Sequence, residues 1–289
     1  APLVQSDIAI GEKGPELNLP KGNIAKIVGP NPFRDADGIV GLAYAPLDIA
    51  KNVKLNTQQE IQPWFTQLVD AGLTENIFSL YTLRSVPYAS KDGALDHDLN
   101  NGLLILGGGE ECTDLYTGSF ETASIVHDKF YNTNLLSVQV GNQPAIEVDP
   151  GEPTDFVPSN SIIDSGTNSL VFETELHNAI ISTFRSEGSQ FVNLINGGRN
   201  GIDQSLIKLE EWPDLTLSLE GPNGPATLVM TPDTYWQFNA FKPGIGFFNI
   251  GRRQGNSILG LPLLNNYFTI FDRSASEGQG LLQFAPIAK

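Results

Sequence analysis

The segment Ser161–Leu170 constrains this chain most, because it places a carboxylate at the end of an apolar strand. Two isoleucines lead into Asp164, the chain turns at Gly166, and apolar residues resume at the end of the segment. A carboxylate in such a place is costly to desolvate unless hydroxyl or backbone N–H groups hold it. Ser165 and Thr167 flank it and offer hydroxyls. Asp164 is therefore a candidate for chemistry, and the alternative is an ordinary Asx turn that ends a strand.

Composition favours a β-rich protein with a sizeable core. The chain has 289 residues, is 40% apolar, and contains 29 glycines and 19 prolines, which indicates frequent turns. β-branched and aromatic residues are plentiful, so we expect an all-β fold, mainly strands with a few short helices. The formal net charge of −16 argues against nucleic acid or an anionic membrane as a partner, because no basic patch offsets phosphate charge.

Other classes of protein are excluded by simple patterns. No apolar stretch reaches the roughly 18 residues that a membrane span needs. The N-terminus lacks the basic and apolar regions of a signal peptide. Cys112 is the single cysteine, so no intrachain disulfide is expected. The compartment stays open, since a large core does not need disulfides.

Hydrophobic periodicity predicts two helices and a series of strands. Apolar residues at helical spacing predict helices over 59–71, with Gly72 at the C′ position, and over 173–186. Strands are predicted within 3–28, with breaks at Gly11, Gly14-Pro15 and Pro20, and near 77–81, 102–106, 130–148, 215–219, 226–230, 247–250, 257–260, 267–271 and 281–284. Residues 85–101 and 150–158 are expected to be loops.

Two short segments echo each other. Asp37–Leu42 and Asn256–Leu261 each run from a polar residue through small and apolar residues to Gly-Leu. One occurrence in each half indicates two related lobes rather than a short-period repeat. The number of residues between Asp164 and Ile258 is much larger than the number of residues that precede Ile39. If the halves are duplicates, the first half's counterpart of Asp164 lies before residue 1.

The Asp164 segment, the two echoing segments and the C-terminal strand follow one another in an order and spacing that resemble those of the pepsin-like aspartic proteases. The resemblance extends from the first strand to the last residue. Ile162–Thr167 resembles the second catalytic motif, hydrophobic-hydrophobic-Asp-Ser/Thr-Gly-Thr/Ser. Ile258–Gly260 resembles the glycine element beneath that motif, and Asp37–Tyr44 resembles its N-terminal counterpart. Tyr267–Arg273 resembles the closing strand of the family.

The resemblance implies a bilobal pepsin-like acid protease fold. Residues 1–129 would be the remainder of an incomplete N-terminal lobe, and residues 130–289 would be the C-terminal lobe with the second catalytic motif. The family's first Asp-Thr/Ser-Gly motif and its flap hairpin are absent from the sequence. The part that carries them would be a separate N-terminal light chain of the same precursor, or a portion outside this sequence.

The resemblance also implies site residues. Asp164 would be one of two catalytic aspartates, and support for the pair would come from Ser165, Gly166 and Thr167. The substrate cleft would be lined by Ile39, Ile258 and Leu261. Leu261 stands where an acidic residue often follows the glycine element, so it would alter substrate preference or pH response.

The implied reaction is peptide-bond hydrolysis without a metal or other cofactor. Two carboxylates that share one proton activate a water molecule, one acting as base and the other as acid. The implied partners are peptide or protein substrates in an extended conformation and pepstatin-like inhibitors. The alternative is a catalytically inactive relative that binds peptides or a protein in the same cleft. A weaker alternative is a truncated product that folds poorly.

Three other residue groups have side chains or spacings that occur in functional sites. Cys112 with His97 or His127 would form a thiol–imidazole pair, but a free surface or half-buried thiol is favoured because no helix lies behind it. Asp96-His97-Asp98 has ligand types for a metal but no matching second cluster, which favours a solvated loop. The three glycines after residue 106 are not a phosphate loop, because no Lys-Ser/Thr follows.

Overall fold

The computed structural model describes residues 3–10, 17–25, 40–47, 49–52, 57–60, 62–84, 101–151, 154 and 158–288. The helices are α1 (Trp64–Asp70), α2 (Thr174–Glu187), α3 (Ser189–Gly198), α4 (Pro232–Tyr235) and α5 (Leu261–Leu264). The strands are β1 (Leu3–Ile10), β2 (Leu17–Ala25), β3 (Ile49–Asn52), β4 (Thr57–Glu60), β5 (Ile77–Thr82), β6 (Gly102–Leu106), β7 (Glu121–Ser124), β8 (Tyr131–Thr133), β9 (Leu135–Val140), β10 (Ile146–Glu147), β11 (Ser161–Ile163), β12 (Leu170–Glu173), β13 (Ile202–Asp203), β14 (Leu215–Leu219), β15 (Ala226–Met230), β16 (Trp236–Gln237), β17 (Ile245–Phe248), β18 (Ile250–Arg253), β19 (Ser257–Leu259), β20 (Tyr267–Asp272) and β21 (Leu281–Pro286).

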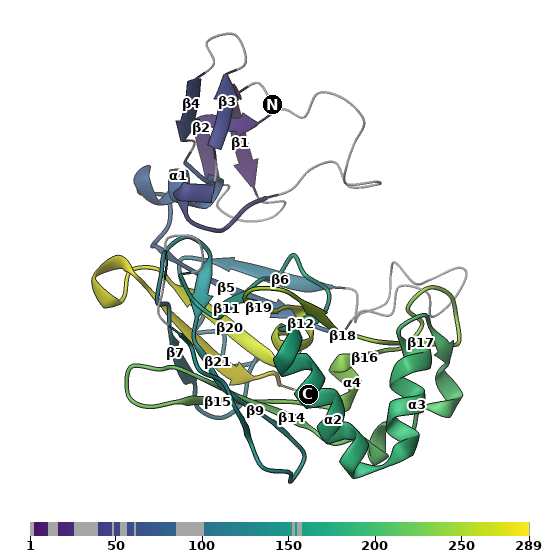
Figure 1. Cartoon of the computed structure of the whole chain (residues 1–289). Helices are drawn as coiled ribbons and strands as arrows, with labels where there is room; N and C mark the ends of the chain where they lie inside the picture. Colours follow the sequence, from purple (N-terminus) through teal and green to yellow (C-terminus); the bar gives the residue numbers. More distant parts are fainter. Residues whose placement is uncertain are drawn as a thin grey trace.

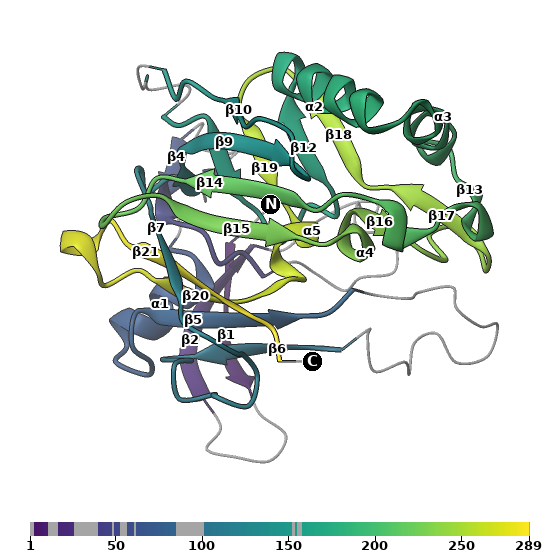
Figure 2. The same ribbon diagram turned by 90° about the horizontal axis from the view of Figure 1, so that it is seen from below.

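Three larger sheets and the small sheet β13-β17-β16 form the main body (Figure 1), which confirms the prediction of a mainly β fold with a few short helices. One five-stranded sheet has the order β18-β12-β19-β11-β8, and a four-stranded sheet has the order β10-β9-β14-β15. The third sheet has the order β6-β5-β20-β21-β7. Seen from below, α2 and α3 lie at the edge of the body, with α2 next to β12 and β18 and α3 near β13 and β17 (Figure 2). Among the described residues, no helix has the length and apolar character to cross a membrane.

The third sheet joins strands from both sides of the predicted lobe boundary. β20, near the C-terminus, pairs antiparallel with β5, and Phe271 lies opposite Phe78 in the register. The two rings stack with centroids 4.6 Å apart, a separation typical of a stabilising aromatic pair. The division at residues 129 and 130 stays a prediction, but the strands on its two sides share one sheet.

The α1 helix is shorter than the predicted helix over 59–71. Residues 57–60 form β4, and the helix begins after Pro63, which stands at its N-cap with φ −55° and ψ 150°. Proline has no N–H and a fixed φ, so it starts a helix but does not continue one. The end of the helix agrees with the prediction: Gly72 has φ +66°, and the Leu73 N–H donates to Leu68 O at 3.0 Å. These contacts form a Schellman motif.

Two strand predictions also needed correction. Pro20 does not break the chain, since β2 continues through it and pairs with β1 as a hairpin whose register shifts between Ser6 and Ile8. A bulge tolerates a proline because the bulged residue is left out of the hydrogen-bond ladder. The strand predicted over 247–250 is two strands, β17 and β18. Asn249 separates them because its N–H donates to Tyr235 O at 2.8 Å.

Helix α3 was not predicted. It follows α2 after Gly188 and buries Phe191 and Ile195. Its C-terminal glycines and the short connection hide the apolar spacing that a longer helix displays. Residues 85–100 of the loop predicted at 85–101 and most of the loop at 150–158 lie outside the described residues.

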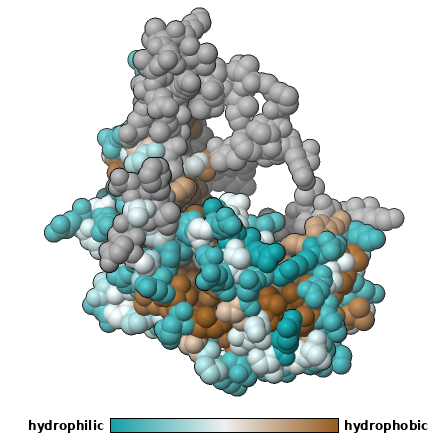
Figure 3. All heavy atoms as spheres, in the orientation of Figure 1, coloured by the Kyte–Doolittle hydropathy of each residue, from teal (hydrophilic) through white to brown (hydrophobic). Residues whose placement is uncertain are grey.

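The hairpin of β14 and β15 follows its predicted alternation. Leu228 is fully buried, whereas Val229, the next residue, is 39% exposed. On the face shown in Figure 3, apolar residues lie between polar ones across the lower body. In the sheet that contains β14 and β15, one face therefore packs on the core while the other meets solvent, as is common in antiparallel sheets.

Strands β1–β4 lie above the main body in Figure 1, with α1 between them and the third sheet. The Phe65 ring of α1 packs edge-on against Phe78 of β5, with centroids 5.1 Å apart. The buried Arg273 guanidinium, just after β20, lies 4.4 Å from the centroid of the Tyr44 ring. Apolar packing and a cation–π contact thus connect this N-terminal part to the third sheet.

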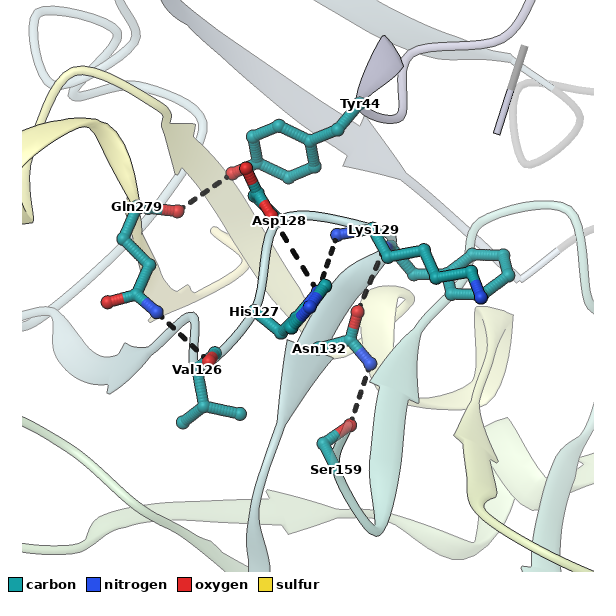
Figure 4. A network of polar contacts seen from close by, with 9 residues as sticks. Tyr44, Val126, His127, Asp128, Lys129, Asn132, Ser159 and Gln279 are labelled. Carbon is teal, nitrogen blue, oxygen red and sulfur yellow. Dashed lines mark hydrogen bonds and ion pairs between the residues drawn. The ribbon is translucent and has the colours of Figure 1, made fainter. Parts of the chain in front are cut away.

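A network of polar contacts supports the approach to β8 and β11 (Figure 4). The Tyr44 hydroxyl donates to Gln279 O at 3.0 Å, and Gln279 Nε2 donates to Val126 O at 3.0 Å. On β8, Asn132 Nδ2 donates to Ser159 Oγ at 2.8 Å. Asn132 and Ser159 are buried, so their hydrogen bond satisfies groups that would otherwise be costly. The bond between Asn132 and Ser159 connects β8 to the residues that lead into β11 and Asp164.

The buried side chain of Tyr44 should make the folded protein less stable at alkaline pH. Burial raises the pKa of Tyr44 to about 12, whereas an unfolded tyrosine titrates near its ordinary pKa of about 10. The folded state holds the proton of the Tyr44 hydroxyl more tightly than the unfolded state does. The contribution of this group to the free energy of unfolding is therefore complete below about pH 10 and is lost as the pH rises towards 12. The full loss is about 3 kcal/mol.

Urea unfolding at about pH 9 and about pH 11 measures this effect. We expect Tyr44→Phe to lose less stability than the wild-type protein between these two values. The variant also lacks the hydroxyl bond to Gln279, so its stability at the lower pH should fall by about 1 kcal/mol. Equal losses in both proteins would contradict the assignment of this titration to Tyr44.

Candidate active site

Asp164 stands at the point where β11 ends, and both of its carboxylate oxygens are held. All three residues of β11 are buried, whereas Asp164 is half-buried. The Gly166 N–H donates to Asp164 Oδ1 at 2.9 Å, and Thr167 Oγ1 donates to Oδ2 at 2.5 Å. A Cβ on residue 166 would lie 3.1 Å from Oδ1, so glycine leaves room for the carboxylate. The hydrogen bonds fix the direction in which the carboxylate points.

Ser165 behaves differently from Thr167. Its side chain is exposed, and no hydrogen bond to Asp164 is present among the described residues. The second donor to the carboxylate is the backbone of Gly166 rather than the expected Ser165 hydroxyl, because the turn directs Ser165 to solvent. A role for Ser165 in supporting an aspartate pair stays a prediction.

Strand β19 lies directly beside β11 and continues into the glycine element. The two strands are parallel, with Ile162 opposite Ile258, and the Asp164 N–H donates to Leu259 O at 3.2 Å. A Cβ on Gly260 would lie 2.5 Å from Ser169 O and closer still to Thr167 O. Only glycine permits this approach of two backbones.

After Gly260 the chain stays bonded to the aspartate turn. The Leu261 N–H donates to Thr167 O at 2.8 Å, and α5 begins there. Leu170, on the far side of the turn, donates its N–H to Asn249 O at 2.9 Å. Backbone hydrogen bonds on both sides thus hold the turn in place.

A cavity of about 410 Å³ lies beside this turn. The residues that line it come from the ends of β5 and β6, from the aspartate turn and from the C-terminal half: Thr82, Leu83, Asn101, Gly102, Asn168, Ser169, Thr234, Gln237, Ala240, Phe241, Phe247, Asn249, Leu261, Pro262 and Asn265. Its size and its mixture of aromatic walls with a few amides are typical of ligand sites.

The three residues predicted to line a substrate cleft have different outcomes. Leu261 lines the cavity. Ile258 is half-buried in the sheet between Ile162 and Val171 and is not part of the cavity wall. Ile39 lies outside the described residues, and its neighbour Val40 is 63% exposed. The cleft roles of all three stay predictions.

The amides of the cavity were not predicted. Asn265 Oδ1 accepts from Thr82 Oγ1 at 3.0 Å, and Ser169 Oγ donates to Asn249 Oδ1 at 3.4 Å. Thr82 lies at the end of β5, far from Asn265 in sequence, so no local pattern could have paired them. The one available signal was Asn249, a polar residue inside an apolar run.

The other candidate sites gain no support. Cys112 is a free, half-buried thiol, and burial together with Glu111 and Asp114 raises its pKa, which disfavours the reactive thiolate. Asp96-His97-Asp98 lies outside the described residues. Elsewhere in the described ranges, no group of three or more His, Cys, Asp or Glu side chains is placed to hold a metal.

Comparison with known proteins identifies the family. The family model described as eukaryotic aspartyl protease matches residues 26–283. This chain belongs to the eukaryotic aspartyl protease family. The match spans both the glycine elements and the Asp164 turn, so the resemblance of these motifs to the pepsin-like aspartic proteases is confirmed at the level of the family.

Individual aspartyl proteases are distant in sequence. Pepsin II-2/3 of Oryctolagus cuniculus is 24% identical over 250 residues, which are 85% of this chain and 53% of that protein. Beta-secretase of Strongylocentrotus purpuratus is 25% identical over 262 residues, 82% of this chain and 45% of that protein. Pepsin-2B of Gadus morhua is 25% identical over 266 residues, 90% of this chain and 67% of that protein. The chain thus spans about half the length of the first two relatives.

Proposed function

We propose that this member of the aspartyl protease family is an aspartic endopeptidase in which Asp164 supplies one of two catalytic carboxylates. The observation that carries the proposal is the held carboxylate: Gly166 and Thr167 each donate to one oxygen of Asp164. In the proposed reaction, a second aspartate comes from a segment outside these 289 residues. Two close carboxylates share one proton because both cannot ionise together.

The proposed mechanism needs no covalent intermediate. A water molecule between the two carboxylates gives a proton to the ionised one and attacks the scissile carbonyl carbon. The protonated carboxyl group donates its proton to the carbonyl oxygen, and the tetrahedral intermediate collapses with protonation of the leaving amine. This chain contributes one of the two carboxylates, Asp164, and the hydrogen bonds that hold it in place.

The proposed substrate is a peptide in an extended conformation, with apolar side chains beside the scissile bond. Phe241, Phe247 and Leu261 offer apolar surface in the cavity beside the Asp164 turn. Pepstatin-like inhibitors would compete for the same cleft. A segment of the same precursor that carries Asp-Thr-Gly would be the protein partner of this chain.

Intact mass analysis of the native protein tests whether the second carboxylate exists. We expect either a longer chain or a co-purifying fragment that contains Asp-Thr/Ser-Gly. Native protein that contains neither, and that cleaves no peptide in acid, would overturn the proposed activity. That result would favour the second candidate, an inactive relative that binds peptides in the same cleft.

Thr167→Val should reduce kcat by about 10–100-fold, because it removes the donor to Asp164 Oδ2 and loosens the carboxylate. Thr167→Ser keeps a hydroxyl and should retain most activity. Ser165→Ala removes an exposed hydroxyl without a bond to Asp164 and should stay within about twofold of wild type. Steady-state kinetics on the full-length protein measure all three. Equal losses in Thr167→Val and Ser165→Ala would contradict the positioning role of Thr167.

A further inference from the structure

A second cavity adjoins the first, and its charged wall residues are all basic. It has a volume of about 220 Å³ and lies where α2, the end of α3, β17 and β18 meet at one corner of the molecule (Figure 2). Ser169 and Phe247 line both cavities. The titratable residues in its wall are His177, Arg199 and Arg252.

Neither arginine has an acidic partner in the described part of the chain. Arg199 follows the last residue of α3 and Arg252 lies on β18, and both are exposed. The ion pairs within 4.0 Å in the described part of the chain involve neither Arg199 nor Arg252. The whole chain has 33 acidic residues against 17 Lys and Arg. Two arginines at one cavity without a carboxylate therefore run against the general charge of the protein.

A buried histidine orients one of these arginines. His177 is 2% exposed, and its Nε2 lies 3.0 Å from Arg199 Nη2. A guanidinium only donates, so Nε2 accepts and the proton resides on Nδ1, which lies 3.5 Å from Asn178 Oδ1. Burial lowers the pKa of His177, and the two arginines lower it further. The imidazole is thus a neutral acceptor that fixes Arg199 without neutralising its charge.

The remaining walls are suited to an anion. Phe248 and Ile250 are buried and apolar and line the cavity beside the arginines. Such surroundings strengthen a charge-assisted hydrogen bond relative to one in open water. We propose that this cavity binds a carboxylate or phosphate-like oxyanion, held by Arg199 and Arg252.

The oxyanion has two possible sources. One is an acidic side chain or terminus of a peptide in the larger cavity, because Ser169 and Phe247 connect the two spaces. This source rests on the proposed peptidase function and extends it to a preference for acidic residues. The other source is a free anion, which needs neither a substrate nor catalysis.

Titration of the full-length protein with inorganic phosphate, followed by the backbone amide shift of Gly251, tests the site. We expect saturable binding that Arg199→Gln and Arg252→Gln each weaken about tenfold, the loss of one charged hydrogen bond. Arg253→Gln is the matched control, because it removes the same charge from the next position of β18 and leaves the cavity wall intact. Arg252→Gln does not disturb His177, so it remains informative if Arg199→Gln folds poorly.

A saturable shift that all three variants share, or no saturable shift in the wild-type protein, would overturn the proposal. Two peptides that differ only by Glu or Gln then identify the source. Tighter binding of the Glu peptide, lost in Arg252→Gln, supports a peptide carboxylate. Equal binding of the two peptides, with phosphate binding retained, supports a free anion. Neither titration depends on turnover, so a failure of the peptidase proposal leaves the phosphate result standing.

Discussion

Asp164→Asn should lower kcat for peptide hydrolysis by the full-length protein at least about 1,000-fold, while leaving folding nearly unchanged. Asparagine has the same shape as aspartate and still accepts from the Gly166 N–H, which lies 2.9 Å from Oδ1 in the wild-type protein. Its amide cannot take a proton from water or share one with a second carboxylate. The Asp164→Asn variant should therefore lose its activity and keep its stability.

Asp203→Asn is the matched control. Asp203 likewise lies at a turn and accepts a backbone hydrogen bond, from the Ser205 N–H at 2.9 Å, but it is exposed and does not line the cavity beside the Asp164 turn. Its variant should keep wild-type kcat. Thermal unfolding should give Asp164→Asn a Tm within about 2 °C of wild type, since no packing is lost. Retained turnover in Asp164→Asn would remove this residue from the mechanism.

Gly260→Ala should have the largest effect on folding. The added methyl group would lie 2.5 Å from Ser169 O and closer to Thr167 O, and both atoms belong to backbone that cannot rotate away. Overpacking against a rigid wall costs about 3 kcal/mol or more. The turn that holds Asp164 would shift with Thr167, because Thr167 O also accepts from the Leu261 N–H.

Gly251→Ala provides the comparison for this substitution. Gly251 lies on β18, in the sheet that also contains β19. A Cβ on Gly251 would first meet Val171 Cγ2 at 3.9 Å, an ordinary contact distance. Urea unfolding should show a change of less than about 1 kcal/mol for Gly251→Ala. A Gly260→Ala protein as stable as Gly251→Ala would contradict the close backbone approach at residue 260.

Local features of the fold were predictable from the sequence. The Asp164 turn could be anticipated because its donors lie within three residues of the carboxylate. The C-terminus of α1 followed from Gly72, whose positive φ suits glycine. The start of α1 was misplaced because apolar spacing outweighed Pro63, which stops a helix from extending backwards.

Features made by distant segments were not predictable in this way. The larger cavity combines Thr82 with Asn265, and the smaller one combines His177 with Arg252. These residues meet only because β5, α2 and β18 are brought together by sheet pairing and packing. The role of Gly260 became visible through resemblance to a family, and its physical reason became clear from the carbonyl groups that surround it.

Cleavage of an apolar peptide by the full-length protein at about pH 4, measured with and without pepstatin, tests the pairing of Asp164 with a second aspartate most directly. We expect cleavage that pepstatin stops and that Asp164→Asn removes. Cleavage that pepstatin does not affect and that persists in a folded Asp164→Asn protein would contradict the pairing.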